Sequence, residues 1–232
     1  MASAVKVMFR FKKLDLYCER LDSSFWAEPI NAFTNLFIFL AGVYGLSESR
    51  KLPSKSEVRQ IKICSYLAMA TGIGSFLFHT FANSLTMWLD ILPITLFQIF
   101  SINFFLQFVL LTPLVARLIF LTLFVALSLH LKSEAYVEYF NGSLMYAPSL
   151  VTLFVLGAIT WLKKMKGVSI CLYASVLIFT VSITARSYDL EICEHFPLGT
   201  HFIWHSLNGL LIILLLKAMI IHTKAELNFA KD

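Results

Sequence analysis

Apolar runs long enough to cross a lipid bilayer recur along almost the whole chain. A membrane-spanning helix needs about 20 predominantly apolar residues, and hydrophobic residues make up 58% of the 232 positions. The runs cover residues 29–48, 62–81, 85–111, 113–131, 143–162, 168–187 and 200–221. Because little sequence remains outside them, we expect an all-α membrane protein. It would form a single seven-helix transmembrane bundle domain over residues 1–232, with a short acidic segment at residues 14–28 before the first helix.

Basic residues in the loops predict the orientation of this bundle. Cytoplasmic loops of membrane proteins are enriched in Lys and Arg, and short loops carry most of this signal. The loops after the first and fifth helices and the C-terminal end share one side, and they contain Arg50, Lys51, Lys55, Arg59, Lys62, Lys163, Lys164, Lys166, Lys217, Lys224 and Lys231. We therefore expect the C-terminus in the cytoplasm and the N-terminus outside, although the N-terminal tail is also basic. The net charge of +5 is then a topology signal, and no nucleic-acid partner is expected.

Polar side chains within the apolar runs recur at helical spacing. They form four sets: Glu28, Asn31 and Asn35; Ser75 and His79; Thr86 and Asp90; and His201, His205 and Asn208. Residues three or four apart lie on the same face of a helix. Because polar groups that face lipid are costly, each set is expected to face the interior of the bundle.

Three histidines and one aspartate are predicted to lie at the same depth. His79 ends the second run, Asp90 follows the start of the third, and His201 and His205 open the last run. Since successive helices alternate in direction, these positions all fall near the outer face. Three imidazoles that leave one position open form a catalytic type of zinc site, whose water has a lowered pKa.

This constellation predicts metal-assisted hydrolysis of a carbonyl compound. Asp90 would orient or deprotonate the water, or orient a histidine ligand. Ser75 would donate a hydrogen bond to the water or to an oxyanion. A site reached through the bilayer implies a membrane lipid as substrate. A lone buried histidine is more often a packing residue, so the metal interpretation depends on the whole set.

Acidic residues and cysteines on the outer side allow further interpretations. Asp15, Glu19, Asp22 and Glu28 offer the oxygen ligands that calcium prefers, or form a solvated segment that caps the first helix. Cys18 and Cys193 would pair in an oxidising exterior, or stay as free thiols. Arg186 and Asp189, at the end of the sixth run, are predicted to form a structural ion pair.

Several motifs resemble those of the alkaline ceramidases, most closely their shorter bacterial-type relatives. The motifs are Tyr17-Cys-Glu-Arg20, Phe25-Trp-Ala-Glu-Pro-Ile-Asn31 with Thr34-Asn-Leu36, Gly72-Ile-Gly-Ser-Phe-Leu-Phe-His79, Leu89-Asp-Ile-Leu-Pro93 and Gly199-Thr-His-Phe-Ile-Trp-His-Ser-Leu-Asn208. They occur in order over nearly the whole chain. The wider superfamily also contains the adiponectin and progestin receptors.

The resemblance implies an intramembrane zinc amidase that cleaves the N-acyl bond of ceramide, or of a related N-acylated lipid, into a fatty acid and an amine lipid. It implies zinc ligands at His79, His201 and His205, with Ser75 and Asp90 at the catalytic water. It also implies calcium at Glu19 and Glu28, with Asp15 or Asp22 substituting for polar ligands where this chain has Leu16 and Leu21, and a disulfide between Cys18 and Cys193. The bacterial-type likeness implies an inner membrane, with the active site near its extracytoplasmic face.

Two other functions fit a seven-helix bundle. A receptor or structural membrane protein of the same superfamily would keep the metal site without hydrolysis, since one scaffold can host several functions. An ion transporter is disfavoured because the inner halves of the helices are overwhelmingly apolar. Hydrolysis of a lipid would separate the enzyme from both alternatives.

Overall fold

The computed structural model describes residues 13–133 and 139–229, and all regular secondary structure in these ranges is helical. The α-helices are α2 (Pro29–Arg50), α3 (Ser56–Phe81), α4 (Ser84–Phe104), α5 (Leu114–Leu131), α6 (Ala147–Leu162), α7 (Lys166–Tyr188) and α8 (His201–Phe229). A π-helix, η1 (Phe105–Val109), continues α4, and two 3-10 helices, η2 (Tyr139–Tyr146) and η3 (Leu190–Ile192), precede α6 and follow α7. Seven segments of the described chain are long and apolar enough to cross a membrane, which confirms the predicted fold class.

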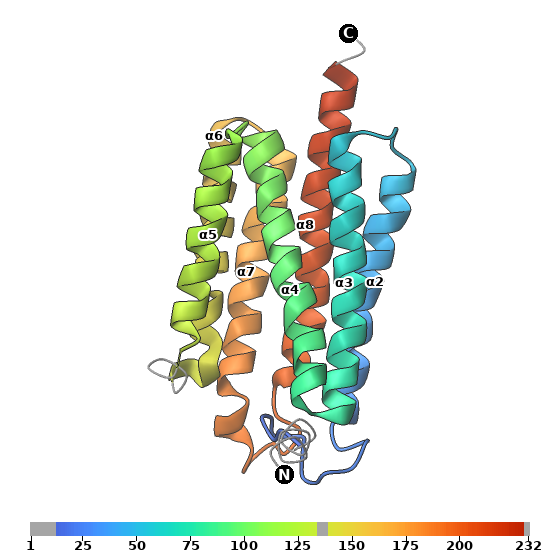
Figure 1. Ribbon diagram of the computed structural model, residues 1–232, viewed down its shortest axis with the longest axis vertical. Coiled ribbons are helices and arrows are strands. Elements are labelled where there is room, and N and C mark those ends of the chain that lie inside the picture. The colour runs from blue at the N-terminus through green and yellow to red at the C-terminus, as the bar shows by residue number, and fades with distance from the viewer. Residues whose placement is uncertain (1–12, 134–138, 230–232) are drawn as a thin grey trace, which may run out of the picture.

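The bundle is organised around α8, which packs against α2, α3 and α7. Figure 1 shows α5 and α6 on one flank, α2 and α3 on the other, and α8 between them. The blue segment before α2, the corner between α3 and α4, and the loop between α7 and α8 gather at the lower end of the view. The same end therefore collects the start of α8 and the end of α3, where the candidate ligands lie.

Two helices extend beyond the apolar runs that predicted them. Helix α3 begins at Ser56 instead of residue 62, and α8 continues to Phe229 instead of ending at residue 221. The added turns contain Glu, Lys, Arg, Gln and Ala, which are good helix formers outside a bilayer as well as within it. Hydrophobicity therefore indicated the membrane-crossing part of α3 and α8, while the helix propensity of the polar residues extended both helices beyond it.

Helix α5 lies at the periphery, and Phe124 is its one buried residue. Most of its other side chains are exposed, which agrees with a lipid-exposed helix because lipid accepts apolar side chains without penalty. The polar sets at the site-bearing end lie on α2, α3, α4 and α8 instead. Glu28, Asn31 and Asn35 are each at most 2% exposed, as their spacing predicts.

The connection between α3 and α4 is as short as the sequence indicates. Ala82 adopts a left-handed conformation with φ of 46° and ends α3. Asn83 then caps α4, because its side chain accepts hydrogen bonds from the backbone N–H groups of Leu85 and Thr86. The Thr86 hydroxyl accepts one in return from the N–H of Asn83, completing a capping box. The two helices are consequently antiparallel neighbours.

Gly74 lets the backbones of α3 and α4 approach each other beside the candidate site. A Cβ at this position would overlap the carbonyl oxygen of Leu89, and it would lie 2.6 Å from the carbonyl carbon of that residue. The next residue of each chain segment, Ser75 on α3 and Asp90 on α4, is a candidate catalytic residue. The close approach therefore sets the distance between these two side chains.

We expect Gly74→Ala to destabilise the protein by about 3 kcal/mol or more, because a backbone clash cannot relax by side-chain rotation. Gly167→Ala is the matched control, since its Cβ would meet only the end of the Ile221 side chain, at 3.3 Å. Thermal unfolding in detergent should give a clearly lower midpoint for Gly74→Ala alone. Equal midpoints for both variants would contradict the observed α3–α4 packing.

Candidate metal centre

Three buried histidines from α3 and α8 face one another. His79, His201 and His205 are each at most 2% exposed, and each offers a ligand nitrogen within 4.8 Å of the others. Their ring centroids are 5.2 Å apart for His79 and His201, 4.7 Å for His79 and His205, and 4.5 Å for His201 and His205. Among the residues that the structure describes, no other group of His, Cys, Asp or Glu converges in this way.

Each of the three histidine rings contacts another protein side chain. Nδ1 of His79 lies 2.5 Å from Oε2 of Glu28, and Nδ1 of His205 lies 3.1 Å from the Thr34 hydroxyl. The Tyr17 ring stacks on His201 with centroids 3.7 Å apart. Metal-binding histidines usually have a hydrogen-bonded outer partner such as Glu28 or Thr34, which fixes the ring and its tautomer, whereas the stacked Tyr17 ring fixes only the position of His201.

The unsatisfied nitrogens fit a metal ion. The Glu28 carboxylate accepts a hydrogen bond from the N–H at Nδ1 of His79, so Nε2 carries the lone pair, and this buried atom has no protein partner. The Thr34 hydroxyl donates to backbone oxygens of Ile30 and Asn31, so it accepts from His205 and leaves Nε2 of that ring as the acceptor as well. Nδ1 of His201 is also buried without a partner. Buried polar groups are rarely left unpaired, so these nitrogens match a site with three imidazole ligands.

We expect Thr34→Val to weaken metal binding by roughly 10- to 100-fold, as loss of an outer partner of a histidine ligand generally does. Valine keeps the shape of threonine but removes the hydroxyl that lies 3.1 Å from Nδ1 of His205. Metal competition with a chromogenic chelator would measure the change. Thr180→Val is the control, because Thr180 is an exposed helix residue whose hydroxyl binds only the backbone oxygen of Val176; similar affinities in both variants would remove Thr34 from the site.

Asp90 and Ser75 share a cavity with two of the histidines. The cavity has a volume of about 230 Å³, and its walls include Ser75, Asp90, His201 and His205. Ser75 is a hydrogen-bond partner of the Asp90 carboxylate, while Oδ1 of Asp90 is buried without a partner. The structure therefore brings together all five residues of the predicted zinc site, with a free carboxylate oxygen available to a reacting group.

The same cavity contains residues that the sequence did not single out. They are Tyr17, Lys132, Asn141, Tyr146 and Trp204. Trp204 lies in α8, and the other four lie in the segment before α2, at the end of α5 and in η2. Burial raises the pKa of Tyr17 above its ordinary value. The pKa of Lys132 is lowered, mainly by burial and to a smaller extent by the positive charge of Arg186. Irregular segments have no periodicity, so no spacing signal could have found most of these residues.

Arg186 and Asp189 take different partners, so the prediction of an ion pair between them is wrong. Arg186 lines the cavity, donates to the backbone oxygen of Asn141 at 2.6 Å and the Ser143 hydroxyl at 2.8 Å, and lies 5.7 Å from the Tyr146 ring centroid. Asp189, the residue after α7, keeps a helical backbone conformation, and its carboxylate accepts hydrogen bonds from the segments before α2 and before α8 instead.

Asp189 joins three parts of the chain at the base of the site. Its Oδ1 accepts hydrogen bonds from the backbone N–H groups of Thr200 and His201, at 2.7 and 2.8 Å, and its Oδ2 accepts from the N–H of Cys18 at 3.1 Å. Carboxylates stabilise helix N-termini in this way. Asp189 consequently fixes the first turn of α8, which carries two of the three histidines.

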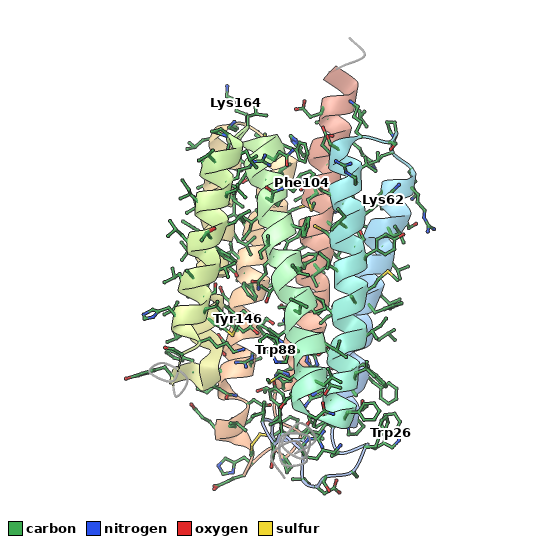
Figure 2. All side chains as sticks on the ribbon, in the orientation of Figure 1. Trp26, Lys62, Trp88, Phe104, Tyr146 and Lys164 are labelled. Atoms are coloured by element: carbon green, nitrogen blue, oxygen red, sulfur yellow. A yellow bond between two sulfur atoms is a disulfide. The ribbon has the colours of Figure 1, made fainter. Side chains whose placement is uncertain are left out.

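The structure joins Cys18 to Cys193 in a disulfide, with Cα atoms 5.3 Å apart. Gly199 packs beside it with φ of 63°, where a Cβ would lie 2.7 Å from Cβ of Cys18 and would overlap the Asp189 carboxylate. The bond links the segment before α2 to the loop before α8. In Figure 2 the sulfur–sulfur bond lies at the lower end of the bundle, the end at which Trp26 is labelled.

The four acidic residues of the N-terminal segment are not gathered around a common point. Both carboxylate oxygens of Glu19 accept N–H groups at the start of α2, from Ile30 and Asn31, and burial raises the pKa of Glu19. Glu28 binds His79 and Arg20; burial opposes its ionisation, but these two partners together lower its pKa. Asp15 and Asp22 lie on the surface. Calcium binding stays a prediction, without a converging set of acidic ligands to support it.

Comparison with known proteins gives one family match. A family model described as Ceramidase matches residues 16–230. Searches of curated proteins and of solved structures gave no match. The matched range contains the three histidines, Ser75, Asp90 and all seven membrane-spanning helices. The predicted likeness to the ceramidases is thus confirmed, and the chain belongs to the Ceramidase family.

Proposed function

We propose that this protein is a zinc-dependent intramembrane amidase that cleaves the N-acyl bond of ceramide or a related N-acylated lipid. Family membership implies an amide hydrolase. The observation that carries the finer proposal is the convergence of His79, His201 and His205 beside Asp90 and Ser75 on one cavity. Nitrogen ligands in this number suit zinc better than the hard cations that prefer oxygen.

The residues around the cavity support a hydrolytic mechanism. Zinc at the three imidazoles would act as a Lewis acid toward the carbonyl and raise the acidity of water beside it. The Asp90 carboxylate accepts a proton from the attacking water and returns it to the leaving nitrogen, so that the amide and one water yield a carboxylic acid and an amine. Ser75 donates its hydroxyl hydrogen to the Asp90 carboxylate in the structure, and during the reaction this hydroxyl would turn to donate toward the oxygen on which negative charge develops.

A second cavity supports a lipid as the substrate. This cavity, of about 70 Å³, has mainly apolar walls, and it shares Ile38, Ile94, Tyr146 and Trp204 with the cavity that contains Asp90. If the amide carbonyl lies near the histidines, the acyl chain attached to it would extend into the apolar cavity inside the bundle. Burial of methylene groups there would add about 0.8 kcal/mol each, which favours long-chain N-acyl compounds over soluble amides.

The charge distribution supports an active site near the extracytoplasmic face. Lys62, in the second turn of α3, and Lys164, in the loop before α7, are labelled at the upper end in Figure 2, opposite Trp26 and the segment before α2. The positive-inside rule assigns the lysine-rich end to the cytoplasm. The histidines and the disulfide then lie on the outer side, where oxidising conditions favour a disulfide.

The test is a hydrolysis screen on protein purified in detergent, with ceramides and other N-acyl lipids that differ in head group and acyl length. We expect fatty acid release that stops after zinc is removed by a chelator and returns when zinc is added back. Activity that survives complete zinc removal would contradict the proposal. Tight zinc binding without hydrolysis of any of these lipids would favour the receptor or structural alternative.

A further inference from the structure

Arg20 places a buried positive charge in the acidic segment. Its side chain is 1% exposed, and it reaches three oxygen acceptors from different parts of the chain. Its Nε donates to Oε1 of Glu28 at 2.5 Å, Nη2 to the backbone oxygen of His79 at 2.9 Å, and Nη1 to the backbone oxygen of Asp22 at 3.4 Å. The Arg20 guanidinium thus donates hydrogen bonds to one carboxylate and to two backbone carbonyl oxygens.

These acceptors are of the kinds that a calcium ion would bind. Calcium in proteins takes carboxylate and backbone carbonyl oxygens, usually six to eight in all. Two of the other carboxylates of this segment already have partners in the protein. Both oxygens of Glu19 accept N–H groups at the start of α2, and the Asp22 side chain accepts the N–H of Ser24 at the surface. Leu16 and Leu21, where the family resemblance implies polar ligands, are exposed apolar residues. The residues present do not fit a calcium site.

We propose that the guanidinium of Arg20 takes the place of that calcium ion, so that the fold and the histidine site are independent of calcium. A calcium ion would neutralise Glu28 and draw the acidic segment onto the bundle; Arg20 does both with a charge that is part of the chain. Arginine suits this role because its planar group presents several donors in a fixed arrangement and stays ionised when buried.

Arg20 also acts on the histidine site through Glu28. Arg20 binds one oxygen of the Glu28 carboxylate, while Nδ1 of His79 and the Asn31 side chain bind the other. A second hydrogen bond from Arg20 satisfies the carbonyl of His79 in the last turn of α3, where no helical N–H is available. Arg20 is therefore a positioning residue, which holds the carboxylate that orients His79.

The first experiment titrates calcium into zinc-loaded wild-type protein purified without added calcium, with thermal unfolding and calorimetry as readouts. We expect no calorimetric binding and a midpoint that moves by less than about 1 °C up to millimolar calcium, since a bound ligand would raise it. A rise of several degrees, or a saturable calorimetric signal, would overturn the proposal. Neither readout uses hydrolysis, so failure of the proposed enzymatic function would leave this result intact.

The second experiment removes the guanidinium group of Arg20. We expect Arg20→Ala to unfold at a lower temperature, to bind zinc at least about tenfold more weakly, and to recover part of both losses with calcium but not with magnesium, which tolerates few ligand geometries. Arg50→Ala, at the exposed end of α2 far from the site, is the control and should resemble the wild type. Wild-type zinc affinity in Arg20→Ala would overturn the proposal.

A conservative variant keeps the proposal testable if Arg20→Ala does not fold. Lysine retains the charge in Arg20→Lys but cannot reach three acceptors in the arginine geometry. We expect weaker zinc binding than in the wild type and still no response to calcium, because the ammonium group occupies the site. A calcium-dependent rise in the midpoint of Arg20→Lys would contradict the role assigned to the cation.

Discussion

Replacing His205 with alanine is expected to abolish zinc binding and lipid hydrolysis together. The substitution removes one of three ligand nitrogens that lie within 4.8 Å of one another, and it leaves only His79 and His201. We expect the zinc affinity to fall on the order of a thousandfold, which corresponds to about 4 kcal/mol. Activity should fall to background, because the proposed chemistry requires the metal.

Metal analysis of the purified variant, together with the fatty acid release assay, would measure both effects. His195→Ala is a suitable control because His195 is an exposed histidine in the loop between α7 and α8. It should keep both zinc and activity. A His205→Ala protein that retained stoichiometric zinc and full hydrolysis would remove the histidine set from the proposed active site.

Replacing Asp90 with asparagine is expected to separate metal binding from catalysis. The amide keeps the size of the carboxylate and its contact with Ser75, but it cannot accept and return a proton. General acid–base catalysis typically contributes about 10²- to 10⁴-fold to a rate, so kcat should fall by this factor. Zinc content should stay at the wild-type level, since Asp90 is not one of the three converging ligands.

Kinetic analysis distinguishes this role from a structural one. A proton-transfer residue lowers kcat with little change in KM, whereas a residue needed for substrate binding raises KM. Glu191→Gln, which alters an exposed acid in η3, should leave both constants unchanged. A loss of zinc in Asp90→Asn, or an unchanged kcat, would contradict the assignment of Asp90 as the proton carrier.

The residues that could be predicted from the sequence lie on regular helices. Glu28 precedes the first turn of α2, and His79, Asp90, His201 and His205 lie within a turn or two of a helix end. Because polar residues are expensive inside a membrane, their spacing alone indicated which side of each helix faces inward. Alternation of helix direction then gave a common depth, and the structure brings the three histidines together as expected.

The residues that could not be predicted depend on tertiary contacts of irregular segments. Tyr17 and Arg20 lie in the segment before α2, where the chain has no repeating geometry, yet they contact His201 and His79. Arg186 and Asp189 are three residues apart, so a continuing helix would have paired them. Each instead binds groups from a distant segment, Arg186 at Asn141 and Asp189 at Cys18, and local spacing carries no signal for such partners.

The order of the site residues along the chain has a consequence for biogenesis. The disulfide joins residues separated by 175 positions, and the last histidine lies on the last of the membrane-spanning helices. A nascent chain that inserts from its N-terminus therefore carries His79 in the bilayer without its metal partners through most of translation. Thiol oxidation and loading of the proposed zinc site are therefore late steps of assembly, and a ribosome-stalled chain that lacks α8 contains both cysteines but cannot complete the metal site.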